Sequence, residues 1–293
     1  SFAVYPPISL TPAERRRVVE HTTAIALALR ARGLLNLQFV IQDGEAFVLE
    51  VNPRASRTVP FLSKVTGVPM VALATLAALG GSLPESGLRE PSGLHAVKAP
   101  VFSMAKLRAV DAILGPEMKS TGEAMGVARD LATAQYRAFL STMEDLPADG
   151  AALCSIADAD KLEALPILRG LHGLGIRLFA TEGTARLLRG AGIPAVPVAK
   201  LREGHPSVID VIQSGEVHLV VNTVSVSRDG ANPLRDGFEI RRASVERRIP
   251  CLTSLDTAGA LVEALKGARR RSAWSVIALD EFATIQSGEP VRP

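Results

Sequence analysis

Short apolar runs alternate with helical patterns throughout the second half of the chain, and this alternation limits the possible folds more than any other feature. Continuous runs of Val, Ile and Leu separated by helices are typical of a parallel sheet covered on both faces. We therefore predict an α/β fold for residues 150–293, with ligands at the carboxyl ends of the strands. The predicted strands are residues 151–156, 176–181, 195–199, 218–223, 251–254 and 275–278. The predicted helices are residues 161–174, 184–190, 206–213, 237–248 and 257–267.

The first half of the chain is α+β and lacks a complete sheet of its own. A long helix is predicted to begin after Thr11, because Pro12 and Glu14 follow it with the spacing of a capping box. Asp43-Gly44 between two apolar runs is a strong hairpin signal. The predicted helices are residues 11–32, 70–79 and 130–143, and the predicted strands are residues 35–41, 46–51 and 97–102.

Length and composition indicate two globular domains. A chain of 293 residues has room for two, and a turn-rich break near residues 146–150 predicts domains 1–147 and 148–293. Hydrophobic residues make up 47% and charged residues 22%, close to the average of globular proteins. The longest apolar stretch, residues 69–79, is far short of the roughly 20 residues of a membrane span. The first residues do not form a signal peptide, so neither a membrane nor secretion is expected.

Charge and aromatic content argue against nucleic acid as a partner. The 33 basic residues are nearly balanced by 30 acidic ones, and clusters such as residues 15–17 are expected to form solvated helix faces. Only two Tyr and one Trp are available for stacking on bases. Cys154 and Cys251 lie in apolar runs without metal or disulfide spacing, so we expect core residues in a reducing, cytoplasmic compartment.

The hairpin around Asp43-Gly44 carries candidate metal ligands. Glu50 and Asn52 are two residues apart on a strand and so share a face. A two-residue turn would pair Gln38 with Leu49 and direct it away from Glu50. A three-residue turn with a bulge would pair Gln38 with Val48 and place it diagonally from Glu50. We predict the bulged turn, because one carboxylate and two amides on one face suit Mg²⁺. An ordinary surface hairpin with one polar face is the alternative.

The residues from Glu50 to Phe61, EVNPRASRTVPF, resemble the metal-binding strand and loop of ATP-grasp ligases. They are most similar to the second, carbamate-phosphorylating half of carbamoyl-phosphate synthase large subunits. The segments 34–39, 63–69, 114–123, 222–223 and 251–257 resemble the same family in the same order. The family makes carbamoyl phosphate from bicarbonate, ammonia from glutamine and two ATP, for pyrimidine and arginine biosynthesis.

The resemblance implies roles for the matching residues. Gln38, Glu50 and Asn52 would hold two Mg²⁺ or Mn²⁺ ions that bridge the phosphates of the substrate ATP. Arg54 and Arg57 would hold the transferred phosphoryl group or the carbamate, because a guanidinium suits oxyanions. The family's upstream glycine-rich loop and first synthetase half do not precede Ser1. We therefore expect Ser1 to mark a cut inside an ATP-grasp domain, and the isolated chain to have no turnover. The implied partners are the rest of the large subunit and a glutaminase small subunit, in an oligomer of heterodimers.

Residues 150–293 resemble the methylglyoxal-synthase-like regulatory domain that ends these large subunits. A nucleotide monophosphate effector such as UMP is the implied ligand, and the candidate residues are Lys161, Thr181, Thr184, Lys200, Asn222 and Thr223. Residues 181–184 lie where a strand passes into a helix, so their hydroxyls and the helix amides can form a phosphate cradle. Thr184 as a simple helix N-cap is the alternative. Asn222, Thr223 and Lys200 end other strands and could meet the cradle at the same sheet edge.

Two departures from the family argue against control by ornithine. An acidic residue is expected after Val97-Lys98, where this chain has Ala99, and a Tyr is expected where it has Cys251. Two other functions remain as alternatives: a stand-alone nucleotide-binding fragment without catalysis, and a methylglyoxal-synthase-like lyase. The lyase would use the side chains His172, His205, His218 and Asp210, none of which has the usual motif context.

Overall fold

The computed structural model describes residues 2–84, 87–89, 93–104, 111, 113, 117–143, 150–201, 203–223 and 233–269. The chain divides into two compact units, which we call the N-terminal unit (residues 3–98) and the C-terminal unit (residues 1–2 and 99–273). The predicted domain boundary at 147/148 and the predicted strand at 275–278 lie outside the described residues.

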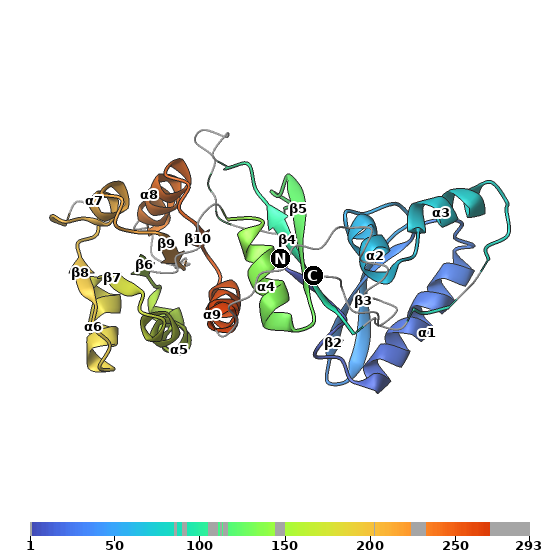
Figure 1. Cartoon of the computed structure of the whole chain (residues 1–293), viewed down its shortest axis with the longest axis horizontal. Coiled ribbons are helices and arrows are strands. Elements are labelled where there is room, and N and C mark those ends of the chain that lie inside the picture. The colour runs from blue at the N-terminus through green and yellow to red at the C-terminus, as the bar shows by residue number, and fades with distance from the viewer. Residues whose placement is uncertain are drawn as a thin grey trace, which may run out of the picture. The chain divides into compact units, whose positions relative to one another are not determined.

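The C-terminal unit contains the parallel sheet that the sequence predicts. Its five strands have the order β10-β9-β6-β7-β8, and all the pairings between them are parallel (Figure 1). The strands are β6 (Ala151–Ser155), β7 (Arg177–Thr181), β8 (Val196–Val198), β9 (Leu219–Asn222) and β10 (Cys251–Leu252). The helices that follow them are α5 (Lys161–Gly173), α6 (Glu182–Gly190), α7 (Val208–Gln213), α8 (Pro233–Glu246) and α9 (Leu255–Arg269). The predicted α/β class is confirmed, and the order places a topological switch point between β6 and β9.

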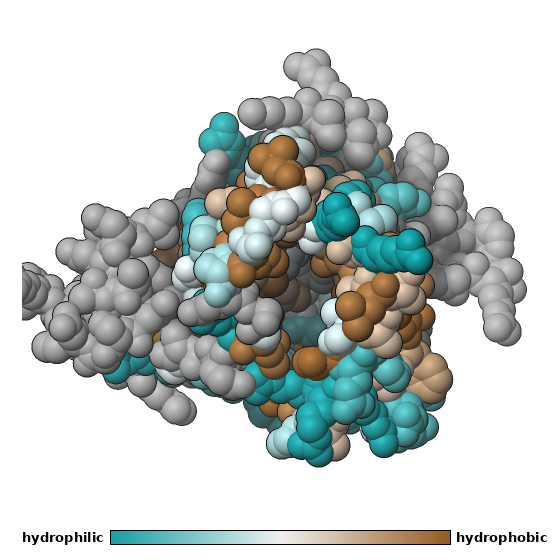
Figure 2. Space-filling view, turned by 90° about the vertical axis from the view of Figure 1, so that its right-hand side faces the viewer, coloured by the Kyte–Doolittle hydropathy of each residue, from teal (hydrophilic) through white to brown (hydrophobic). Residues whose placement is uncertain are grey.

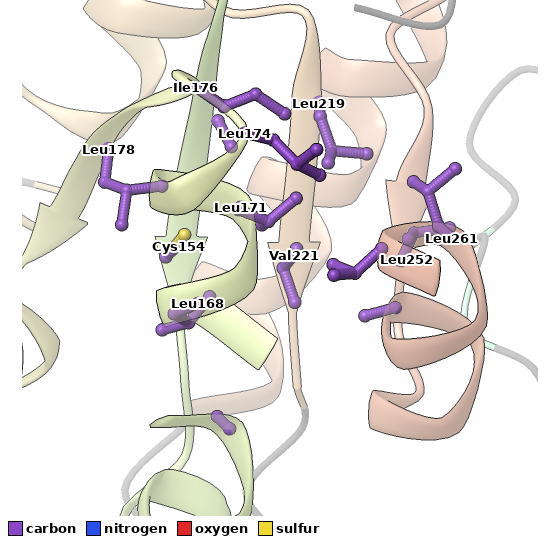
Figure 3. Close-up of a cluster of buried hydrophobic side chains, with 14 of the residues drawn as sticks. Cys154, Leu168, Leu171, Leu174, Ile176, Leu178, Leu219, Val221, Leu252 and Leu261 are labelled. Carbon is purple, nitrogen blue, oxygen red and sulfur yellow. The ribbon is translucent and has the colours of Figure 1, made fainter. Parts of the chain in front are cut away.

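Both faces of this sheet are buried, because side chains that alternate along each strand enter two separate cores. Ala152 and Cys154 of β6 join Leu168 and Leu261 on the face covered by α5, α6 and α9 (Figure 3). Leu153 and its neighbours in adjacent strands join the second core under α7 and α8. Burial raises the pKa of the Cys154 thiol to about 12, so this cysteine is a core residue, as predicted.

A second group of elements in the C-terminal unit packs against the first core. It comprises β5 (Gly122–Ala128) and α4 (Leu131–Leu140). A separate short 3-10 helix, Asp158–Asp160, lies between β6 and α5. Phe139 of α4 is fully buried in the core beside α9, and its ring lies 4.8 Å from that of Phe2. β5 was not predicted, while α4 begins at the predicted position with Asp130 as its N-cap.

The N-terminal unit consists of β1 (Ala3–Tyr5), α1 (Pro12–Ala28), β2 (Asn36–Gln42), β3 (Glu45–Asn52), α2 (Thr58–Thr66) and α3 (Met70–Ala78). β4 (His95–Val101) begins in this unit and pairs antiparallel with β1, in a sheet of order β1-β4-β5. The capping box at Thr11 and Glu14 forms as predicted, with the Thr11 amide donating to Glu14 at 2.7 Å. α1 ends at Ala28 rather than near Gly33, and α2 was not predicted.

Apolar side chains are exposed over much of the N-terminal unit. Neither α1 nor α3 buries a residue, although the α3 sequence is almost entirely apolar. Leu27 is 73% exposed and Leu79 is 82% exposed. On the hairpin, the exposed apolar residues are Val40, Phe47, Val48 and Leu49. Figure 2 shows brown side chains gathered around a recess on the side where this unit faces the viewer. Exposed apolar groups of this extent are typical of surfaces that contact another protein.

Within the described residues, no single helix has both the length and the apolar content to cross a membrane. Helices α2 and α3 are long and apolar enough only when they are taken together, and the chain bends by 110° between them.

Candidate functional site

The hairpin register brings the predicted metal ligands onto one face by a different route from the predicted one. Gln42 pairs with Glu45, so the turn contains only Asp43 and Gly44, both with positive φ, and the predicted three-residue turn is wrong. The register then shifts between Gln38 and Phe39, where β3 carries the extra residue Leu49. This bulge in the middle of the strand pairs Gln38 directly with Glu50.

Four polar residues lie on that face of the hairpin. Gln38 faces Glu50, and Asn36 faces Asn52 in the next pair of the same face. The Asn52 Nδ2 donates to Glu50 Oε1 at 2.8 Å, and both Gln38 and Glu50 are exposed. Directly paired residues of an antiparallel ladder have Cβ atoms about 5 Å apart, so side-chain oxygens of Gln38, Glu50 and Asn52 can reach one ion.

The donor set fits a hard divalent cation. A carboxylate and two amide oxygens on an open face leave room for water and phosphate oxygens, which Mg²⁺ retains around it. Among the described residues, no group of three His, Cys, Asp or Glu side chains could hold a metal. Glu50 is therefore the charged member of a set completed by neutral amides, and the remaining charge neutralisation would come from phosphate.

The predicted arginines follow Asn52 in the connection to α2. The Arg54 amide donates to the Asn52 carbonyl at 2.9 Å, which turns the chain after β3. The Arg54 guanidinium Nη1 donates to the Ala55 carbonyl at 3.0 Å, and this side chain is exposed. Arg57 is the residue that precedes α2 and does not cap the helix with its side chain.

The second candidate site lies at the carboxyl edge of the parallel sheet, around the first turn of α6. Lys161 extends over Gly183, since a Cβ added to this glycine would lie 2.8 Å from the Lys161 Nζ. Lys161 also donates a hydrogen bond to Asp158. That bond, with the charges of Lys161 and Lys200, holds the pKa of Asp158 below its usual value. An ammonium group beside the positive end of a helix favours a bound anion.

Thr181 and Thr184 lie in the first turn of α6, and the structure does not support the alternative in which Thr184 serves only as the helix N-cap. Thr181 is the N-cap residue of α6, so the interpretation of Thr184 as the N-cap is wrong. Thr184 is completely buried, and its Oγ1 accepts the Ile156 amide at 3.2 Å and the Thr181 hydroxyl at 3.4 Å. The hydroxyl of Thr184 therefore joins the end of β6 to the first turn of α6.

Asn222 and Thr223 end β9 on the other side of β6. The Thr223 Oγ1 accepts the Ala157 amide at 2.8 Å, and the Thr223 amide donates to the Ser155 carbonyl at 3.2 Å. Both side chains are almost fully buried. The candidate residues at or after the carboxyl ends of β6, β7 and β9 thus share one edge of the sheet. Lys200 follows β8 and is exposed. Its positive charge acts on this group of residues by helping to lower the pKa of Asp158.

A cavity of about 300 Å³ lies beside Thr223. It is lined by Ile113, Asp160, Glu163, Thr223, Thr253, Leu255 and Asp256. Its three carboxylates distinguish it from the Lys161 edge, where the charge is positive.

The residues of the lyase alternative do not form a free acid–base pair. His205 Nδ1 lies 2.5 Å from Asp210 Oδ2, which also accepts the Ser207 amide at 2.7 Å in the capping box of α7. The Ser207 amide, His205 and the Ser207 hydroxyl lower the pKa of Asp210 to about 2, so it is a weak base. His218 precedes β9 at the opposite edge of the sheet.

Two arginines that the sequence did not indicate form hydrogen bonds at these sites. Arg17 of α1 donates to the carbonyl of Gly44, and its Nη1 lies 2.5 Å from Glu45 Oε1, so α1 holds the hairpin turn. Arg241 of α8 is 1% exposed and contacts Asn222. The only sequence signal for Arg241 is its position in a helix that packs on the sheet.

Comparisons with known proteins match both halves of the chain. Residues 1–86 match the family model for the carbamoyl-phosphate synthase L chain, ATP binding domain. Residues 163–253 match the family model for the MGS-like domain. Over 272 residues, 91% of this chain, the sequence is 56% identical to the carbamoyl phosphate synthase large chain of Thermomicrobium roseum. The match covers 25% of that relative, so the chain spans about a quarter of its length.

The fold and the matches define the class of the chain: a segment of an ATP-binding domain joined to an MGS-like α/β domain. The chain is a homologue of the carbamoyl phosphate synthase large chain, and the resemblance expected from its sequence is confirmed.

Proposed function

We propose that this chain supplies two functions to a carbamoyl-phosphate synthase large subunit. The hairpin residues would position metal–ATP for phosphorylation of carbamate, and the edge of the parallel sheet would bind a nucleotide monophosphate that regulates the enzyme. The observation that carries the first part is the register that sets Gln38 opposite Glu50, on the strand that ends at Asn52 just before Arg54.

Phosphoryl transfer depends mainly on position and charge neutralisation, so few reactive groups are required. Mg²⁺ or Mn²⁺ bound with ATP would neutralise charge on the phosphates. Gln38, Glu50 and Asn52 would hold the ions. Arg54 and Arg57 follow this face directly and would hold the oxygens of the carbamate or of the transferred group through their guanidinium forks.

The whole enzyme would make carbamoyl phosphate from bicarbonate, ammonia from glutamine and two ATP. The rest of the large subunit and a glutaminase subunit would be its partners, in a cytoplasmic oligomer of heterodimers. The exposed apolar residues of α1, α3 and the hairpin support contact with further polypeptide, because α3 buries no residue in this unit. We expect the isolated chain to be inactive.

A chimera tests the catalytic part. The matching quarter of the Thermomicrobium roseum large chain is replaced by this chain, and carbamoyl phosphate synthesis is measured with ammonia, bicarbonate and ATP. The chimera should be active, its Glu50→Gln variant should lose most activity, and the isolated chain should have none. Turnover by the isolated chain, or full activity of the Glu50→Gln chimera, would contradict the proposal.

Binding of UMP to the isolated chain tests the regulatory part. Lys161→Met removes the ammonium group beside Gly183 and should weaken UMP binding, measured by calorimetry, by about tenfold. Lys266→Met is the matched control, because Lys266 forms the same i,i+3 ion pair, with Glu263 on α9. Equal affinities of the two variants would reject the cradle around α6.

A further inference from the structure

Arg241 is the largest side chain that the C-terminal unit buries completely among the described residues. Its Nε and Nη2 atoms donate to the two carboxylate oxygens of Asp111, each at 2.7 Å. Its Nη1 donates to Asn222 Oδ1 at 3.1 Å. The guanidinium therefore joins two residues 111 positions apart, one of them a candidate effector residue.

The guanidinium packs closely against the backbone of α8 at Gly237. A Cβ added to Gly237, one turn earlier on α8, would lie 2.7 Å from Arg241 Nη1 and 3.6 Å from Asn222 Oδ1. Burial alone would raise the pKa of Asp111, but hydrogen bonds from Arg241 and the Ile113 amide outweigh it and hold the pKa below its usual value. A buried charge of this kind is stable only while its partners stay in place.

Arg241 fixes which end of the Asn222 amide is available at the sheet edge. A guanidinium can only donate, so Asn222 must present its oxygen to Arg241. The amide nitrogen then points away from Arg241, and the contact that it makes among the described residues, with the Ser155 carbonyl, is long at 3.5 Å. A hydrogen-bond donor suits phosphate and nucleobase carbonyl oxygens, which are acceptors.

The ion pair between Arg241 and Asp111 connects the sheet edge at Asn222 to a segment outside the sheet. Asp111 Oδ1 also accepts the Ile113 amide at 3.0 Å. Ile113 lines the cavity that Thr223 lines from the end of β9. Asn222 precedes Thr223, so a ligand that shifts the end of β9 would act on Asp111 through Arg241.

We propose that Arg241 is a positioning residue of the effector site: it orients the Asn222 amide to donate to an acceptor-rich nucleotide, and it links occupancy of that site to the segment at Asp111 and Ile113. The inference rests on the proposed binding of a nucleotide monophosphate at this edge.

The test compares UMP binding and folding in three variants of the 293-residue chain. Arg241→Lys keeps the charge but loses the fork, and should weaken UMP binding by about tenfold or more. Asn222→Asp keeps an acceptor for Arg241 but removes the donor, so the melting temperature should stay the same or rise while UMP affinity falls. Arg242→Lys is the matched control, because the adjacent Arg242 pairs with Glu246 on the same helix at 2.7 Å. It should bind UMP as the unchanged chain does.

Hydrogen exchange supplies a readout that a purely structural role would not move. Saturating UMP should slow exchange of the Ile113 amide in the unchanged chain, and should no longer do so in Arg241→Lys. Folded Asn222→Asp with unchanged UMP affinity would overturn the inference, even if Arg241→Lys fails to fold. If the unchanged chain binds UMP normally and its Ile113 amide does not respond, the link to Asp111 is wrong. If the unchanged chain binds no UMP, the proposed function fails and the inference fails with it.

Discussion

Gln38 lies directly opposite Glu50 across the β2–β3 hairpin, because the register passes over Leu49. Successive residues of a strand point to opposite faces, so one extra residue moves every later side chain of β3 to the other face. Without this bulge, Gln38 would pair with Leu49, and the Glu50 carboxylate would lie on the face opposite Gln38. The bulge at Leu49 therefore assembles the candidate metal face.

Replacement of Glu50 should remove most divalent ion binding by the hairpin. Glu50→Gln keeps the shape of the side chain but removes the only charge among the three proposed ligands, so Mn²⁺ affinity should fall by roughly tenfold or more. Calorimetry or electron paramagnetic resonance with Mn²⁺ measures the change. Glu45→Gln is the control, since Glu45 lies on the same strand and pairs with Arg17. A larger loss in Glu45→Gln than in Glu50→Gln would contradict the assignment.

Arg17 should stabilise the hairpin turn locally. Its bonds to the Gly44 carbonyl and to Glu45 connect α1 to the turn, but the side chain is 42% exposed, so solvent screening limits the contribution to about 1 kcal/mol. Arg17→Met should speed hydrogen exchange of hairpin amides roughly fivefold. Arg16→Met, at an exposed position of α1, should leave exchange unchanged. Identical exchange in both variants would show that α1 does not hold the turn.

The sequence predicted the parts of the fold that follow from local chemistry. The apolar runs at β6, β7 and β9 are continuous because both faces of that sheet are buried, so their positions were clear. The capping box at Thr11 is likewise a local pattern. The bulge was misplaced because Phe47, Val48 and Leu49 are all apolar, so alternation does not reveal where the phase changes.

The contacts of Arg241 could not be predicted for a different reason. Its partner Asp111 is 130 positions away, and nothing in the local pattern of α8 separates the fully buried Arg241 from the half-buried Arg242 that follows it. α2 was missed because Arg57 supplies no side-chain cap and Pro60 lies in its first turn. Such features depend on tertiary packing, which a single sequence does not reveal.

Close packing of β5 on α4 should make Gly126 intolerant of any side chain. A Cβ at Gly126 would lie 2.1 Å from the Ala134 carbonyl oxygen and 2.3 Å from the Ala138 amide nitrogen, both backbone atoms that cannot rotate away. Gly126→Ala should therefore lower the free energy of unfolding by about 3 kcal/mol, measured by urea denaturation. Gly173→Ala, at the end of α5 with open space around the added Cβ, should change stability by less than about 1 kcal/mol. Equal stability of the two variants would show that β5 and α4 are not in close contact.

The carboxylate of Asp210 should make the stability of the C-terminal unit depend on pH in the acid range. The Ser207 amide, His205 and the Ser207 hydroxyl lower its pKa from 3.8 to about 2 in the folded chain. A lowered folded pKa means that the unfolded chain binds the proton more tightly, so Asp210 stabilises the fold above pH 3.8. This contribution should disappear as the pH falls from 3.8 to about 2.

Asp210→Asn isolates this effect, because asparagine keeps an acceptor for the Ser207 amide but cannot ionise. Thermal unfolding at intervals between pH 6 and pH 2 measures it. The unchanged chain should be more stable than the variant at pH 6, and the difference should shrink below pH 3.8. Glu216→Gln is the control, since Glu216 pairs with Arg177 at the surface, at 3.1 Å, and does not take part in a helix cap. A stability difference that stays constant down to pH 2 would show that the charge of Asp210 does not stabilise α7. The capping box would then act through its hydrogen bonds alone.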